Sequence, residues 1–228
     1  MASKNSKLQK EQSLSPSAVR RMREKEQRYE TLLRAAEHLF VSQGYHQTSV
    51  ENIADRAEVS VGTVYFYFKN KEELLLKLFS EGVHTLRVIL GQAFLKAEKP
   101  EKGFEAAGIA FFDEFCIKHP GKVAILFKES VGQSGLLEEA RRTMLKKLTD
   151  DVYTALLAVS EAMGIVYRNP HSAQVVAVGI LGIYERVAYQ YLMWADVHDK
   201  NELGTVGRDA VAFIMGGLNQ FKTLSGLS

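Results

Sequence analysis

Hydroxyl and cationic side chains gather in one short stretch of the chain, between residues 60 and 71. Thr63, Tyr65 and Tyr67 supply neutral hydroxyl donors, and Lys69 and Lys71 follow directly. Hydroxyl donors beside cations are groups that hold the phosphate oxygens of DNA. We therefore expect this stretch to contact a nucleic-acid backbone.

Three helix starts around this stretch would position those side chains. Thr48 and Glu51 have the spacing of a capping box, in which the hydroxyl takes a free N–H and the carboxylate reaches back. Ser60 is placed to cap a helix over 61–67, and Asn70 is placed to start the next one. Closely spaced starts imply short helices and tight turns, which is typical of a helix-turn-helix.

Helical spacing separates an inward face from an outward face in this segment. The residues expected to form its core are Leu39, Phe40, Ile53, Ala54, Ala57, Val59, Val64, Phe68, Leu74, Leu75 and Leu78. Val61, Gly62 and Thr63 remain outside, as a small tip that can approach a DNA groove. The alternation over 64–68 would also fit a strand, but caps on both sides favour a helix.

The same periodicity continues along the rest of the chain, so we expect an all-α fold. Helices are expected over 23–43, 49–57, 61–67, from Lys71 past Leu90, 101–118, 121–130, 135–163, 171–195 and 205–221. Residues 1–22 are expected to be a disordered basic tail, 23–72 a three-helix DNA-binding domain, and 73–228 a larger helical domain. The tail is a solvated arm, or it adds phosphate contacts or enters a minor groove through Lys4, Lys7, Lys10, Arg20 and Arg21.

Composition agrees with a DNA-binding protein of a reducing compartment. Residues 1–71 hold twelve Lys and Arg against eight Asp and Glu, a balance of +4, whereas the whole chain carries only +2. Cys116 is the single cysteine, so no internal disulfide forms, and a cytoplasmic location is expected. No apolar run approaches the ~20 residues of a membrane span, and no membrane partner is expected.

Residues 28–75 resemble the DNA-binding domain of the tetracycline-repressor (TetR) family. The features that match are Ala35-Ala36, Phe40, Gly44-Tyr45, Thr48, Ile53-Ala54, Ala57, Val59-Ser60, Gly62-Thr63, Tyr65, Phe68, Lys71 and Leu74. The resemblance implies an all-helical homodimer that binds the two half-sites of a palindromic operator in double-stranded DNA. The chain departs from the family at Glu58, where glycine is usual, and at Val61, where many members carry a polar residue.

The resemblance also assigns roles to residues of this segment. The positions that match phosphate contacts are Thr48, Ser60, Tyr65, Tyr67 and Lys71. Val61, Gly62 and Thr63 match the tip of the recognition helix, which meets the bases. Val61 would contact a thymine methyl group there, or make no base-specific contact.

The larger domain resembles the family in layout only, as an effector-binding and dimerisation domain. Its last two helices would pair with their copies through apolar residues, for which the candidates are Val176, Ile180, Ile183, Val211, Ile214, Met215 and Leu218. Gly179, Gly182, Gly216 and Gly217 lower helix propensity, which close helix–helix approach would explain. The alternative is that these residues pack inside the monomer.

An apolar pocket is the expected regulatory site. Its candidate linings are Phe111, Phe115, Phe127, Tyr153 and Tyr184, with Phe104, Phe112, Tyr191 and Trp194 as further aromatic residues. For each residue alone, the alternative is an ordinary core position. Together they suggest a small apolar or aromatic effector, such as an acyl chain.

The sequence thus predicts a ligand-responsive transcription regulator, a repressor released by its effector. One alternative is a DNA-bound adaptor that recruits a protein and has a solid second domain. A helical enzyme is disfavoured, because no phosphate loop, nucleophile elbow or paired carboxylates stand out, and no cofactor is expected. Asp113, Cys116 and His119 have a loose metal-ligand spacing, but a buried free thiol is the preferred interpretation.

Overall fold

The structure is a computed structural model that describes residues 15–167, 169, 171–193 and 200–225. These residues form helices and no strand, which confirms the expected all-α class. The chain divides into two compact units between Leu74 and Leu75, close to the expected boundary at 72/73. The expectation for Lys4, Lys7 and Lys10 lies outside the described residues.

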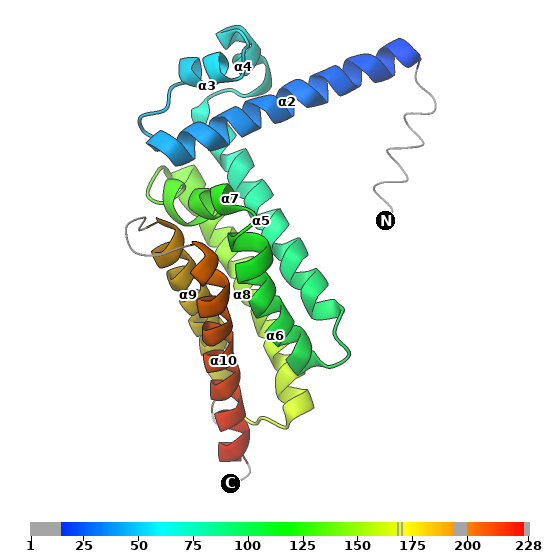
Figure 1. Ribbon diagram of the computed structural model, residues 1–228, viewed down its shortest axis with the longest axis vertical. Helices are drawn as coiled ribbons and strands as arrows, with labels where there is room; N and C mark the ends of the chain where they lie inside the picture. The colour runs from blue at the N-terminus through cyan, green and yellow to red at the C-terminus, as the bar shows by residue number, and fades with distance from the viewer. Residues whose placement is uncertain (1–14, 168, 170, 194–199, 226–228) are drawn as a thin grey trace. The chain divides into compact units, whose positions relative to one another are not determined.

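The first unit contains α2 (Pro16–Gln43), α3 (Val50–Arg56), α4 (Val61–Tyr67) and the first residues of α5 (Lys71–Leu95) (Figure 1). Helix α2 begins at Pro16, with Ser15 accepting a hydrogen bond from the Ala18 amide. The expected tail over 1–22 is therefore wrong for residues 16–22. A serine cap followed by proline at the first helical position is a start signal that the polar composition of this stretch concealed.

The core of the first unit is made by the residues that helical spacing turned inward. Fully or nearly buried are Leu32, Leu33, Ala35, Ala36, Phe40, Ile53, Ala54, Ala57, Val64, Phe68 and Leu74. Leu39 and Val59 are only half-buried, so their assignment to the core was too strong. Ala54 and Ala57 are small, which allows α3 and α4 to lie close together.

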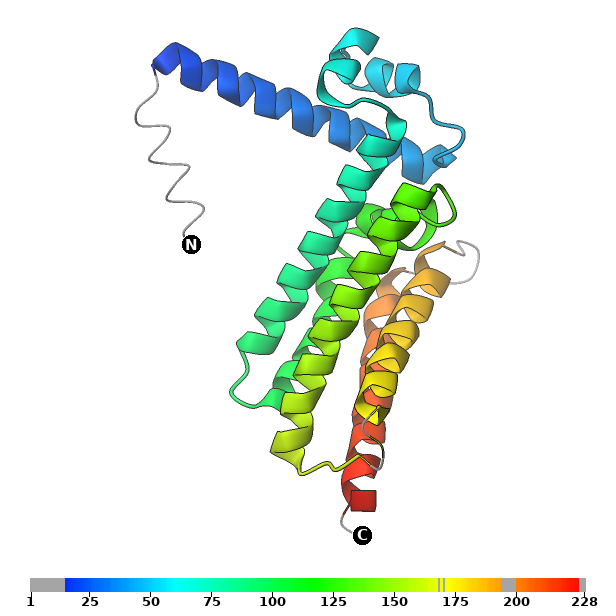
Figure 2. The same ribbon diagram turned by 180° about the vertical axis from the view of Figure 1, so that it is seen from behind.

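The second unit contains the rest of α5, then α6 (Pro100–Ala110), α7 (Pro120–Ala124), α8 (Gly135–Met163), α9 (Ser172–Met193) and α10 (Lys200–Ser225). Helix α8 packs on α6 and α9, and α10 packs on the same two helices. Figure 2 shows α8 and α9 running alongside one another in this unit. The bounds expected for α8, 135–163, are confirmed: Ser134 caps its start and Gly164 ends it in a left-handed conformation.

Two segments of the second unit wind more widely than an α-helix. The π-helix η1 (Phe111–Cys116) continues α6, and the π-helix η2 (Ile125–Glu129) continues α7. Arg141 of α8 donates hydrogen bonds to the Leu126 carbonyl (2.8 Å) and to the Ser130 hydroxyl (2.9 Å). These bonds tie η2 to the neighbouring long helix.

Candidate functional site

Helix α4 begins with the predicted cap. The Ser60 hydroxyl oxygen accepts from the Thr63 amide at 3.2 Å and lies 2.9 Å from the Thr63 hydroxyl. The first turn of α4 is thus fixed by its own side chains. The helix over 61–67 is confirmed, and the strand alternative over 64–68 is excluded.

The outward face of α4 is apolar and aromatic as well as polar. Gly62 is exposed, and the exposed fractions of Tyr65 and Phe66 are 53% and 71%. Sequence reasoning missed Phe66. Val64 and Phe68, on either side of it, are buried, and a residue two positions away on a helix points about 200° around the axis. That spacing was the signal that could have found it.

The end of α4 is held against α2. The Tyr67 hydroxyl donates to the Lys25 carbonyl at 3.2 Å, and the Tyr67 ring lies 6.0 Å from the ring of Tyr29. The Lys25 ammonium lies over the Phe66 ring, 5.5 Å from its centroid. Tyr67 is therefore half-buried with its hydroxyl bonded to α2, and its expected phosphate contact remains a prediction. Lys25 adds a cation beside the exposed face of α4.

Thr48 does not cap α3, so this prediction was wrong. Ser49 is the cap: its hydroxyl accepts from the Asn52 amide at 3.1 Å, and the Asn52 side chain accepts from the Ser49 amide at 3.0 Å. Thr48 is 1% exposed and donates to the Gly44 carbonyl at 2.8 Å. Its expected phosphate contact remains a prediction, with the hydroxyl turned into the protein.

Lys71 also turns toward its own unit. Its ammonium donates to the carbonyls of Tyr45 (2.7 Å) and Thr48 (2.8 Å) and lies 4.2 Å from the centroid of the Tyr45 ring. Partial burial lowers the pKa of Lys71. The side chain thereby joins the start of α5 to the loop before α3. Lys69, which precedes it, is exposed.

Glu58, in the turn between α3 and α4, has a φ of 55°. This is the left-handed region that glycine prefers, so Glu58 accepts a backbone conformation that is less favourable for a residue with a side chain. The turn keeps its shape because the Val59 amide donates to the Ala54 carbonyl at 3.0 Å.

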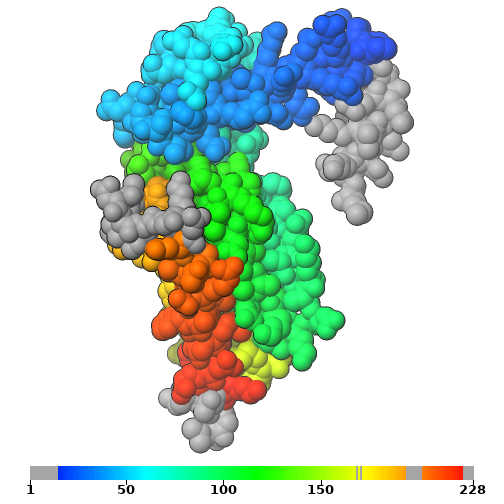
Figure 3. All heavy atoms as spheres, viewed as in Figure 1, coloured from blue at the N-terminus to red at the C-terminus, as the bar shows by residue number. Residues whose placement is uncertain are grey.

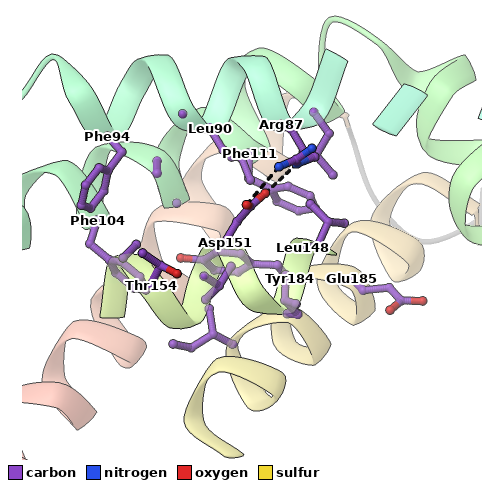
Figure 4. A pocket seen from close by; sticks show the side chains of 18 of the residues that line it. Arg87, Leu90, Phe94, Phe104, Phe111, Leu148, Asp151, Thr154, Tyr184 and Glu185 are labelled. Carbon is purple, nitrogen blue, oxygen red and sulfur yellow. Dashed lines mark hydrogen bonds and ion pairs between the residues drawn. The ribbon is translucent and has the colours of Figure 1, made fainter. Parts of the chain in front are cut away.

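The second unit contains a cavity of about 480 Å³ with a mainly apolar lining. Its walls come from α5, α6, η1, η2, α8 and α9, and Figure 4 shows the main side chains. Aliphatic and aromatic side chains dominate, among them Leu90, Phe94, Phe104, Phe111, Phe127, Leu148 and Ile180. A cavity of this size and character suits a drug-sized or acyl ligand.

One ion pair stands at this pocket. Arg87 of α5 and Asp151 of α8 make two parallel hydrogen bonds, Nε to Oδ2 at 2.6 Å and Nη2 to Oδ1 at 3.0 Å. Their side chains are 43% and 48% exposed, so solvent reaches the pair. The pair links α5 to α8, which form two walls of the pocket.

The structure brings together three of the five residues proposed for ligand binding. Phe111, Phe127 and Tyr184 line the pocket. Phe115 and Tyr153 do not: Phe115 is fully buried behind Phe111, with the ring centroids 6.2 Å apart. For Phe115 the core alternative is the better description. Trp194 lies outside the described residues.

A shallow apolar groove runs between α9 and α10, and Figure 3 shows α10, in red and orange, along the surface of the second unit. Five proposed dimer residues line it, namely Val176, Ile180, Ile183, Ile214 and Leu218, together with Phe213, which is 73% exposed. Ile180, Ile214 and Leu218 are largely buried within the chain, so for these three the alternative of packing inside the monomer also applies. A Cβ added at Gly179, Gly182, Gly216 or Gly217 would meet nothing within 4 Å. Packing inside the chain therefore does not account for these glycines.

Two proposed dimer residues lie elsewhere. Val211 is 3% exposed, and its side chain lies next to Gly108 of α6. It belongs to the core of the unit, as the alternative interpretation held. Met215 is half-buried and is not among the residues that line the groove.

The loose metal-ligand spacing at 113–119 does not form a site. Cys116 is fully buried, and burial raises the pKa of its thiol. Asp113 forms an ion pair with Arg208 at 2.7 Å. Within the part of the chain that the structure describes, no cluster of His, Cys, Asp and Glu could hold a metal ion, and no helix could span a membrane.

Comparison with known proteins adds to this geometry. Residues 32–78 match the family model described as bacterial regulatory proteins, tetR family. The transcriptional activator FasR of Mycolicibacterium smegmatis is 29% identical over 196 residues, which cover 86% of this chain and 84% of that protein. The fatty acid metabolism regulator protein of Bacillus subtilis is 45% identical over 60 residues, or 26% of this chain and 31% of that protein.

A solved structure shares the fold over most of the chain. The transcriptional regulator FadR from Bacillus subtilis, in complex with stearoyl-CoA, aligns with a TM-score of 0.72. The alignment covers 83% of this chain and 98% of that protein, at 20% identity. At this level of identity the likeness shows the arrangement of helices.

Proposed function

The chain belongs to the TetR family of bacterial regulatory proteins and is a DNA-binding transcription regulator; from this premise we propose that it represses transcription and is released by a fatty acyl thioester. The proposed form is a homodimer on a palindromic operator. Each subunit would place α4 in the major groove of one half-site.

The exposed face of α4 supports this mode of DNA binding. Val61, Gly62 and Thr63 make a small tip that base edges can approach, and Tyr65 stands exposed beside it. Exposed cations on α2, such as Arg21 and Arg23, would add electrostatic attraction for the phosphate backbone.

The pocket is the observation that carries the proposed effector. Its lining is mainly apolar, its volume is about 480 Å³, and the half-exposed Arg87–Asp151 pair adds a polar feature that solvent reaches. An acyl chain can fill the apolar part while its polar carrier stays in water. Two similar proteins are named for fatty acid metabolism or are solved with stearoyl-CoA, which supports the same choice.

The adaptor hypothesis requires a second unit with a solid core. The cavity argues against it, because a pocket of this size with a mainly apolar lining is typical of a small-molecule site.

Release from DNA would proceed through α5. This helix starts in the first unit at Lys71, and its residues Arg87, Leu90 and Phe94 line the pocket. A ligand that displaces the pocket-lining part of α5 would shift the population of DNA-binding conformations, provided it binds the two conformations with different affinity.

The test is operator release measured with purified protein. An operator is first selected from random DNA, and its complex is followed by fluorescence anisotropy during titration with acyl-CoA of increasing chain length. We expect release by long-chain acyl-CoA and none by CoA alone. If no acyl-CoA releases the protein from the operator, the proposed effector is wrong. If adding the free protein raises transcription, the proposed repression is wrong.

A further inference from the structure

The hydroxyl of Tyr184 is a polar group placed deep in the apolar pocket. Tyr184 lies on α9 and is 8% exposed. Its ring stacks on Phe111, with the centroids 5.4 Å apart, and meets the edge of Phe112 at 5.3 Å. In the described part of the chain, the hydroxyl makes no hydrogen bond.

Other polar side chains of the pocket are already engaged or turned away. Arg87 and Asp151 bind each other, and the Thr154 hydroxyl donates to the Asp150 carbonyl at 2.8 Å. Figure 4 shows the Glu185 carboxylate pointing away from the other labelled side chains. Tyr184 therefore carries the unused hydrogen-bonding capacity of the pocket.

Gly108 of α6 leaves the space that this hydroxyl occupies. A Cβ added at Gly108 of α6 would collide with the Tyr184 hydroxyl and with Val211, so glycine is needed there. The Tyr184 hydroxyl lines the pocket and has no hydrogen-bond partner among the described residues, so it can donate to a molecule in the pocket. Phenylalanine at 184 would fill the same pocket wall, so packing alone does not account for the hydroxyl, whereas a ligand that accepts its hydrogen bond would.

The protonation state of the Tyr184 hydroxyl also suits a hydrogen-bond donor. Burial raises the pKa of Tyr184 well above its usual range. The group therefore stays protonated and neutral at physiological pH. It would suit a neutral oxygen acceptor such as a carbonyl, whose desolvation costs less than that of an anion.

We infer that the Tyr184 hydroxyl donates a hydrogen bond to the thioester carbonyl oxygen of the bound acyl ligand and so selects acyl thioesters over other long apolar molecules. The inference rests on the proposed function. In an acyl thioester, a single carbonyl lies between a hydrocarbon chain and a polar carrier. The pocket offers matching features: an apolar lining, one buried hydroxyl and the half-exposed ion pair of Arg87 and Asp151.

A pair of ligands that differ only in this carbonyl tests the inference. Dissociation constants are measured for palmitoyl-CoA and for the S-hexadecyl-CoA thioether, with the wild-type protein and Tyr184→Phe. We expect the wild type to prefer the thioester about tenfold, and Tyr184→Phe to lose that preference by binding the thioester more weakly. Tyr153→Phe, a tyrosine outside the pocket lining, is the matched control and keeps the preference.

The outcomes distinguish failure of the proposed function from failure of the role assigned to Tyr184. If the wild type binds neither ligand, the proposed function fails. If it binds both and Tyr184→Phe keeps the wild-type preference, the role of Tyr184 fails while the proposed function stands.

A second measurement does not depend on any variant. The infrared carbonyl band of [1-¹³C]palmitoyl-CoA bound to the wild-type protein should shift to lower frequency, as expected for a hydrogen-bonded carbonyl. A band at the position seen in an apolar solvent would overturn the inference.

Discussion

Gly62 is placed where a side chain would meet no part of its own protein. A Cβ added there lies 3.8 Å from the Ser60 hydroxyl oxygen and otherwise faces open space. Neither packing nor backbone conformation therefore requires glycine in α4. Close approach of DNA, the role proposed for this surface, would explain the glycine.

This explanation predicts opposite effects on stability and on binding. Gly62→Ala should stabilise the first unit by about 0.5–1 kcal/mol, because alanine has the higher helix propensity. The same change should weaken operator binding, since the methyl group stands between α4 and the groove. Thermal unfolding and operator titration measure the two effects, and unchanged affinity for the operator would place Gly62 away from the DNA.

Lys71 and Lys69 can be separated by a matched pair of substitutions. Lys71→Ala should lower the free energy of unfolding by about 1–3 kcal/mol, because the Tyr45 and Thr48 carbonyls lose a charged donor. Lys69→Ala should leave unfolding unchanged and reduce the salt dependence of operator binding by about one charge. If Lys71→Ala changes the salt dependence of operator binding but not the free energy of unfolding, the Lys71 ammonium contacts DNA and does not stabilise the fold.

At the scale of the helix, α3 gives a direct test of its corrected start. Ser49→Ala removes the side chain that accepts from the Asn52 amide and should cost about 1 kcal/mol of stability. Glu51→Ala, at the position first expected to complete the box, should cost less, since the reciprocal Ser49–Asn52 hydrogen bonds remain in place without it. Urea denaturation of both variants decides which residue caps the helix.

Most helices of this chain could be predicted because their ends are marked locally. Ser60 and Ser134 precede α4 and α8, and both helices begin where the sequence indicated. Thr48 and Ser49 are both good caps, so sequence alone chose wrongly between neighbours. The start of α2 was missed because a polar, exposed helix lacks the apolar periodicity on which the prediction relied.

The pocket was only partly predictable for a different reason. Phe111 lies in η1 and Phe127 in η2, and the apolar pattern does not distinguish a π-helical turn from an α-helical one. A change in winding rotates the side chains that follow it, which determines which aromatic residues face a cavity. Phe115 was thus proposed for the pocket but lies behind its wall, while Tyr184 was placed correctly.

For the whole molecule, the α9–α10 groove predicts how subunits associate. Phe213→Glu should convert a dimer into monomers, because Phe213 is 73% exposed in the single chain and a carboxylate would be buried on association. Leu157→Glu, on the exposed side of α8 and outside the groove, is the control and should leave association unchanged. Sedimentation velocity measures both, and a Phe213→Glu protein that remains dimeric would place the interface elsewhere.

Ile180 lines the pocket and also lines the groove. If subunits meet at that groove and effector binding moves this side chain, the two equilibria are coupled, and each changes the other by the same factor. The apparent affinity for the effector then depends on protein concentration. A cell that makes more of this regulator would change not only how much operator is occupied but also the ligand concentration at which it is vacated.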